Sequence, residues 1–124
     1  MFIIEIQKGD EWKWKDIVTL SPGQKSASLV HKINVFDKKT EPIRKNIKIS
    51  DYNDILQSLQ AINLDQVFKE NEENIGLDGW TLSCSISHGV IRHEIAIWNP
   101  EKDSSKSETI RFLEACDKVF ALLD

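Results

Sequence analysis

The chain has 124 residues, of which 40% are hydrophobic and 29% are charged, and its formal net charge at neutral pH is -4. This length is typical of one domain, and the apolar content suffices for a packed core, which excludes a wholly disordered chain. No apolar run approaches the roughly 18–20 residues that cross a bilayer, so the sequence excludes a membrane-spanning helix and predicts a single domain over residues 1–124.

Four segments of the first fifty residues alternate apolar and polar side chains, which is the pattern of a half-buried strand. The first segment centres on Ile4 and Ile6, and the second ends with Val18 and Leu20. The third spans residues 29–35 and the fourth spans residues 43–49. The polar loop between them, residues 37–42, predicts that the third and fourth strands form a hairpin.

The spacing changes after Ser50 and Asp51, either of which is a suitable N-cap for a helix. Apolar residues then recur at helical intervals from Ile55 to Ile62. Residues 64–68 either extend this helix or begin a short second one, and the polar stretch 69–76 is predicted to be a loop.

Residues 80–98 predict a second hairpin, with His88-Gly89 as a two-residue turn. This turn would place Cys84 opposite His93 on the apolar face of the sheet. Ser105 followed by Glu108 resembles a capping box, and the apolar stripe after it predicts a C-terminal amphipathic helix. The sequence therefore predicts an α+β fold in the order ββββαββα, with an antiparallel sheet of about six strands and two helices packed on one face.

Charge is divided unevenly along the chain. Residues 1–50 carry 10 basic and 6 acidic side chains, whereas residues 51–124 carry 6 basic and 14 acidic ones. A solvated loop accounts for the acidic run that begins at Asp65, but an acidic surface also suits a basic partner, because complementary charge speeds association. The side chains predicted to contact such a partner are Asp65, Glu70, Glu72, Glu73, Asp78, Glu94 and Trp98.

The predicted third and fourth strands offer a rival surface. Basic and aromatic side chains on one face of a sheet can follow a nucleic-acid backbone and stack on bases. The outward-facing residues that could do so are Lys32, Asn34, Phe36, Arg44, Asn46 and Lys48. A solvated sheet face is the simpler interpretation.

Cys84 and His93 form the one pairing that resembles a nucleophile with its base. Their predicted burial would raise the pKa of the thiol and block access to it, so a structural role is the favoured interpretation. The residues that could bind a metal are Cys84, His88, His93, Cys116 and His31, but their spacing matches no metal motif. We expect no enzymatic activity, no cofactor and no metal. Two cysteines and the absence of a signal-peptide pattern predict a reducing cytoplasm.

The segment from Gly76-Leu77-Asp78-Gly79-Trp80 through Trp98-Asn99-Pro100 and the terminal helix resembles a recurring ending of small bacterial proteins. Some of these proteins look like immunity partners of secreted or contact-delivered toxins. The resemblance covers residues 76–123 and carries no catalytic residue. It implies a stable scaffold whose partner is a protein toxin.

Three hypotheses follow. In the first, the chain is a toxin-neutralising immunity protein that occludes the active site of a cognate toxin, which we expect to be basic and nuclease-like because nucleases bind phosphate. In the second, it is a small adaptor or nucleic-acid-binding module that uses the basic face near residues 30–48. In the third, it is a thiol enzyme that uses Cys84 and His93. No membrane partner is expected, and the oligomeric state and the identity of the partner stay open.

Overall fold

The computed structural model describes residues 1–10, 13–35, 38–73 and 79–124. The strands are β1 (Ile3–Asp10), β2 (Trp14–Pro22), β3 (Ser26–Val35), β4 (Lys38–Lys39), β5 (Ile43–Lys48), β6 (Thr81–His88) and β7 (Ile91–Trp98). The helices are α1 (Ile49–Gln60), α2 (Leu64–Asn71) and α3 (Ser107–Ala121).

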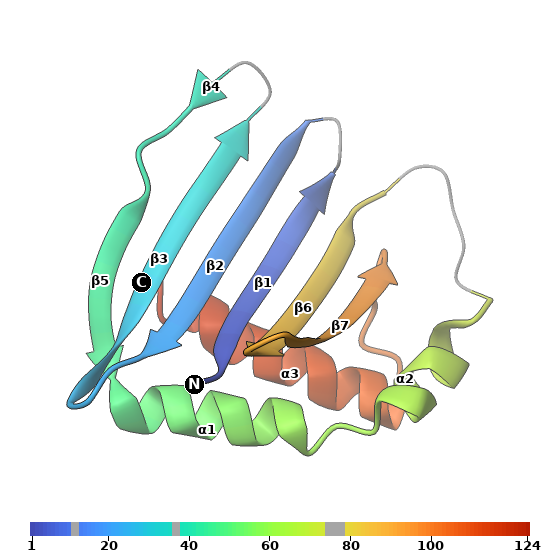
Figure 1. Cartoon of the computed structure of the whole chain (residues 1–124). Helices are drawn as coiled ribbons and strands as arrows, with labels where there is room; N and C mark the ends of the chain where they lie inside the picture. Colours follow the sequence, from blue (N-terminus) through green and yellow to red (C-terminus); the bar gives the residue numbers. More distant parts are fainter. Residues whose placement is uncertain (11–12, 36–37, 74–78) are drawn as a thin grey trace.

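The strands form one antiparallel sheet in the order β4-β3-β2-β1-β6-β7, and β5 also pairs with β3 (Figure 1). β4 contacts the end of β3 near Val35 while β5 pairs with its other end, so these two short strands share one edge of the sheet. The chain then passes through α1 and α2 and returns to place β6 beside β1. The N-terminal strand therefore lies in the middle of the sheet and β7 lies at its far edge.

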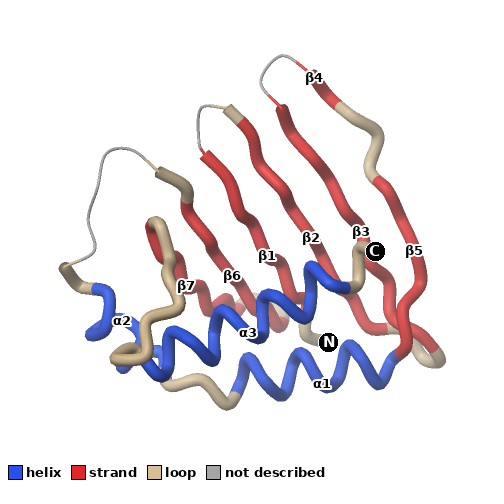
Figure 2. The backbone as a smooth tube through the Cα atoms, turned by 180° about the vertical axis from the view of Figure 1, so that it is seen from behind, coloured by secondary structure: helices blue, strands red, loops and turns tan. Residues whose placement is uncertain are grey.

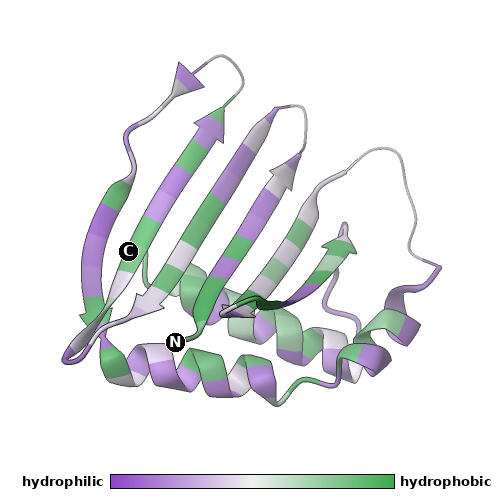
Figure 3. Ribbon diagram, viewed as in Figure 1, coloured by the Kyte–Doolittle hydropathy of each residue, from purple (hydrophilic) through white to green (hydrophobic). Residues whose placement is uncertain are grey.

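α1 and α3 cover one face of the sheet and leave the opposite face open (Figures 1 and 2). Hydrophobic and hydrophilic residues alternate along the strands, as Figure 3 shows. The helix-facing Ile4, Ile6 and Val18 have no exposed surface, and neither does Val119 of α3. Full burial of each such side chain contributes about 1.5–3 kcal/mol. The arrangement of strands and helices confirms the predicted α+β class, the antiparallel sheet and the placement of helices on one face.

The number of helices and the order of elements differ from the sequence-based expectation. Of the two alternatives for residues 64–68, the separate helix is correct: α2 runs from Leu64 to Asn71. Residues 69–71 of the expected loop are therefore helical, and residues 74–76 of it lie outside the described residues. The side chain of Asn63 accepts a hydrogen bond from the Gln66 amide and so caps a new helix start. A short additional strand, β4, also lies within the expected loop between β3 and β5.

Both expected helix starts are wrong in detail. The N-cap of α1 is Lys48, which makes no side-chain capping bond, instead of Ser50 or Asp51. The N-cap of α3 is Lys106, also without a side-chain capping bond, so Ser105 and Glu108 do not form the expected capping box. The Ser105 hydroxyl instead bonds to the carboxylate of Asp103. The start of α3 is capped from another part of the chain, as described below.

The register of the β6–β7 hairpin differs by two residues from the expectation. His88 pairs with Ile91, so the turn is Gly89-Val90 rather than His88-Gly89. Gly89 has a φ of +62° at the first central position, which is the arrangement of a type II′ turn. A shift of two residues keeps every side chain on its face, because side chains alternate with a period of two. The expected faces are therefore right, although Cys84 pairs with Ile95 and not with His93.

Candidate functional site

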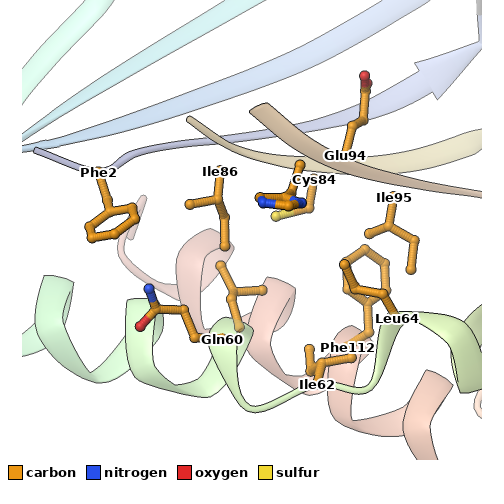
Figure 4. A pocket seen from close by; sticks show the side chains of 11 residues that line it. Phe2, Gln60, Ile62, Leu64, Cys84, Ile86, Glu94, Ile95 and Phe112 are labelled. Carbon is orange, nitrogen blue, oxygen red and sulfur yellow. The ribbon is translucent and has the colours of Figure 1, made fainter. Parts of the chain in front are cut away.

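A pocket of about 320 Å³ lies between the β6–β7 hairpin and the helices (Figure 4). Its walls are mainly apolar and come from β6, β7, the three helices, the segment that joins α1 to α2 and the N-terminus. The lining residues are Phe2, Leu59, Gln60, Ile62, Leu64, Cys84, Ile86, His93, Glu94, Ile95 and Phe112.

Cys84 and His93 both line this pocket, yet the arrangement does not favour thiol chemistry. The Cys84 side chain is 4% exposed, as expected from the sequence. Burial, together with the charge of nearby Glu94, raises the pKa of the Cys84 thiol to about 12. The thiol therefore stays protonated at neutral pH, whereas the thiolate is the reactive form. His93 is exposed and faces Ile86 across the hairpin, so the expectation of a core histidine is wrong.

The remaining candidate ligands for a metal do not converge. No group of three His, Cys, Asp or Glu side chains among the described residues could hold a metal ion. Cys116 is buried, and the pKa of its thiol is raised by burial and by the nearby Cys84. His31 contacts Asp16 at 2.6 Å between Nε2 and Oδ1 on the helix-facing side of β2 and β3. His88 lies beside the β6–β7 turn and stacks on the ring of Phe2.

The residues expected to form one binding surface do not lie together in the structure. Asp65, Glu72 and Glu73 are exposed on α2 or just beyond its end. Glu94 and Trp98 lie on the opposite, open face of the sheet, and the side chain of Glu94 points away from the pocket in Figure 4. Glu70 has a structural role, and Asp78 lies outside the described residues.

Glu70 caps the N-terminus of α3. Its Oε1 accepts hydrogen bonds from the Thr109 amide at 2.8 Å and from the Thr109 hydroxyl at 2.7 Å. Asn71 donates to the same hydroxyl at 2.8 Å, and Thr109 has no exposed surface. Partial desolvation raises the pKa of Glu70, but these bonds, with weaker ones from Gln66 and Glu108, outweigh it and lower the pKa. The carboxylate thus joins α2 to α3 and is not available to a partner.

The exposed surface of α2 contains an aromatic residue that the sequence analysis did not select. Phe68 is 70% exposed and Leu64, one helical turn earlier, is 41% exposed. Asp65 and Glu72 lie three and four residues from Phe68, which places both carboxylates beside its ring on the helix surface. We name Leu64, Asp65, Phe68 and Glu72 the α2 surface. Val67 is 1% exposed, which shows that α2 directs its other side toward the core.

A signal for Phe68 was present in the sequence, but it was ambiguous. Leu64, Val67 and Phe68 are spaced like the apolar stripe of a helix, and such residues are buried more often than exposed. Eight residues can bury only a narrow stripe, and the packing of α2 against α3 decides which side is covered. Which side of α2 is buried therefore depends on tertiary packing, and the local sequence pattern does not reveal it.

The basic strand face is present as expected. Val30 pairs with Arg44 and Ser26 with Lys48, so Arg44 and Lys48 share the open face of the sheet with Lys32. These three basic side chains are exposed. Phe36, the one aromatic residue expected on this face, lies outside the described residues.

Comparison with known proteins gives no family for this chain. A scan against protein-family models, a search of curated proteins and a search of solved structures each return no match. The geometry described above is therefore the basis for a functional proposal. Among the described residues, no helix is long and apolar enough to span a membrane.

Proposed function

We propose that this protein is an immunity protein that binds a cognate protein toxin and occludes the toxin's active site. The observation that carries the proposal is Phe68, an aromatic side chain 70% exposed on α2 between the carboxylates of Asp65 and Glu72. Exposed aromatic residues contribute strongly to binding when a partner desolvates them. An apolar anchor with an acidic rim suits a partner whose contact surface is basic and has an apolar recess.

The proposed mechanism is steric, with electrostatic help. The substrate cleft of a nuclease is basic because it binds phosphate. Phe68 would enter that cleft, and Asp65 and Glu72 would face its basic side chains, so that substrate is excluded. The acids would mainly raise the association rate, and the burial of Phe68 would mainly slow dissociation. Glu70, which holds α2 against α3, would keep this surface in place without contacting the toxin.

The test uses the product of the adjoining reading frame as the candidate toxin. Cells that express this candidate should be rescued by the wild-type chain, and the purified pair should form a stable complex. Phe68→Ala should raise the dissociation constant by about 30-fold or more. Ile43→Ala is the matched control, because Ile43 is 60% exposed at the opposite edge of the sheet. The proposal fails if the toxin kills cells regardless of this chain, or if both variants bind equally well.

A second function is favoured by the basic strand face. Lys32, Arg44 and Lys48 project together from β3 and β5, and a single-stranded nucleic acid could follow this row. A titration with single-stranded RNA at two salt concentrations tests this idea. Phosphate contacts would weaken steeply as salt rises, and Arg44→Glu would weaken binding further. Affinity that is negligible at low salt would dismiss this candidate.

A further inference from the structure

The two edges of the sheet differ in how they are protected against pairing with another strand. The β4–β5 edge is interrupted at Thr40–Pro42 and carries lysines at positions 38, 39, 45 and 48. Short segments, proline and lysine are the devices by which edge strands avoid association. β7 is longer and contains neither lysine nor proline, and its two charged side chains, Arg92 and Glu94, are of opposite sign and contact each other. Among the described residues, β7 pairs only with β6.

The unprotected edge also exposes apolar side chains. Ile91 is 58% exposed and Val90, in the adjoining turn, is fully exposed. On the helix-facing side, Ile95 and His93 border the pocket, and Leu64 of α2 forms the opposite wall. An added strand beside β7 would therefore give hydrogen-bond partners to the edge backbone of residues 92–94 and cover the side of the pocket that faces it.

We propose that a second copy of this chain occupies this edge, with β7 pairing antiparallel to β7 of the second copy. A two-fold axis perpendicular to the sheet relates the copies, so the two sheets become one and both helix layers lie on the same side. This symmetry pairs residues of the same face, because opposite side chains in an antiparallel pair share a face. His93 then lies on the axis, opposite His93 of the partner subunit.

The charges of β7 favour the register in which His93 lies opposite His93 of the partner subunit. Arg92 lies opposite Glu94 of the partner subunit, and Ile91 lies opposite Ile95 of the partner subunit. Within one chain Arg92 and Glu94 already contact each other at 3.7 Å, so pairing would create a network of four alternating charges. A shift of two residues in either direction would place Arg92 opposite itself or Glu94 opposite itself, which is unfavourable. β7 is therefore self-complementary in one register.

Sedimentation velocity of the purified chain from about 1 to 500 µM tests the proposal without any toxin or nucleic acid, so its outcome is independent of the proposed function. The wild type should dimerise. Arg92→Glu and Glu94→Arg should each weaken the dimer by about 10–30-fold, because both symmetric pairs then become repulsive. The double variant R92E/E94R exchanges the charges and should restore the affinity to within about threefold of the wild type.

Arg44→Glu is the matched control, since it makes the same change on the open face at the opposite edge. It should leave the dimer unchanged, and circular dichroism should confirm that every variant is folded. A wild-type chain that stays monomeric across this range overturns the proposal. The same holds if Arg44→Glu weakens a dimer as much as the β7 variants do, or if R92E/E94R does not recover.

A cross-link tests the position of the axis. Cysteines opposite each other in an antiparallel pair lie within the range of Cα separations that a disulfide requires. His93→Cys should therefore form a disulfide-linked dimer under mild oxidation, while the native Cys84 and Cys116 are buried. Ile43→Cys, an exposed position at the other edge, is the control. Equal rates of cross-linking in the two variants would contradict the predicted axis at His93.

Discussion

Glu70 offers the sharpest test of how α2 is held against the remainder of the fold. Replacing Glu70 with alanine removes the acceptor of the Thr109 amide, at 2.8 Å, and of the Thr109 hydroxyl, at 2.7 Å. Thr109 has no exposed surface, so water cannot readily take the place of the lost carboxylate. We expect Glu70→Ala to destabilise both the contact between α2 and α3 and the first turn of α3.

The size of this effect follows from two contributions. A buried donor left without an acceptor costs about 1–3 kcal/mol, and loss of a negative charge at a helix N-terminus costs about 0.3–1 kcal/mol. Asn71 still donates to the Thr109 hydroxyl, so that oxygen keeps one partner. The free energy of unfolding should fall by about 1–4 kcal/mol, which for a chain of 124 residues lowers Tm by about 4–15 °C.

Urea unfolding followed by tryptophan fluorescence and far-ultraviolet circular dichroism measures this difference. Glu72→Ala is the matched control, because it removes the same side chain two positions later from an exposed site. That control should change the free energy of unfolding by less than about 0.5 kcal/mol. If the two variants lose the same free energy, the assignment of Glu70 as the cap of α3 is refuted.

The effect should also depend on pH. Although desolvation opposes it, hydrogen bonding from Thr109, Gln66 and Glu108 lowers the pKa of Glu70 below its ordinary value of 4.5. A carboxyl whose pKa is lower in the folded state stabilises the fold above its unfolded pKa, and this stabilisation disappears as the pH falls through the folded pKa. The difference between the wild type and Glu70→Ala should be complete at pH 7 and shrink below about pH 4.5. A difference that is undiminished near about pH 3 would contradict this reasoning.

The remaining predictions concern the core and the turns. Burial raises the pKa of Cys84 to about 12, so its thiol should not react with a disulfide reagent at pH 8 in the folded protein but should react in denaturant; rapid reaction in the native state would return Cys84 to the candidate nucleophiles. A Cβ at Gly9 would lie 2.2 Å from a backbone carbonyl oxygen, so Gly9→Ala should cost about 2–4 kcal/mol in urea unfolding. Gly89 has a φ of +62° and open space around it, so Gly89→Ala should lower the free energy of unfolding by only about 1 kcal/mol. A larger loss for Gly89→Ala than for Gly9→Ala would contradict this reasoning about both glycines. The Tyr52 hydroxyl donates to the backbone carbonyl of Phe2, just before β1, so Tyr52→Phe should lower the free energy of unfolding by about 1 kcal/mol. An unchanged stability would show that this bond contributes nothing.

Periodicity alone was sufficient to predict most of the elements and their buried faces. Ile4 and Ile6 were expected on the helix-facing side of the first strand, and both are fully buried. The stripe on α3, including Phe112 and Val119, also faces the core as expected. These predictions succeed because burial of apolar surface is the largest favourable term in folding, and its spacing reveals whether a segment is a strand or a helix.

The pairing partners could not be predicted in the same way. The alternation in β6 and β7 specifies the faces, but it is equally satisfied by registers that differ by two residues. The turn at Gly89-Val90 fixes one of these registers, and in it His93 pairs with Ile86 and not with Cys84. The one candidate catalytic pair therefore depended on a turn whose position the alternation does not determine.

The acidic residues show the same division between local and tertiary information. The sequence by itself determined that the second half of the chain is acidic and that its helices are amphipathic. The tertiary structure decided that Glu70 turns inward to cap α3, that Glu94 lies on the other side of the sheet, and that Phe68 stays exposed. A charge or an apolar side chain is visible in the sequence, but the neighbours that cover it come from distant segments, and their positions are known only when the layers have packed.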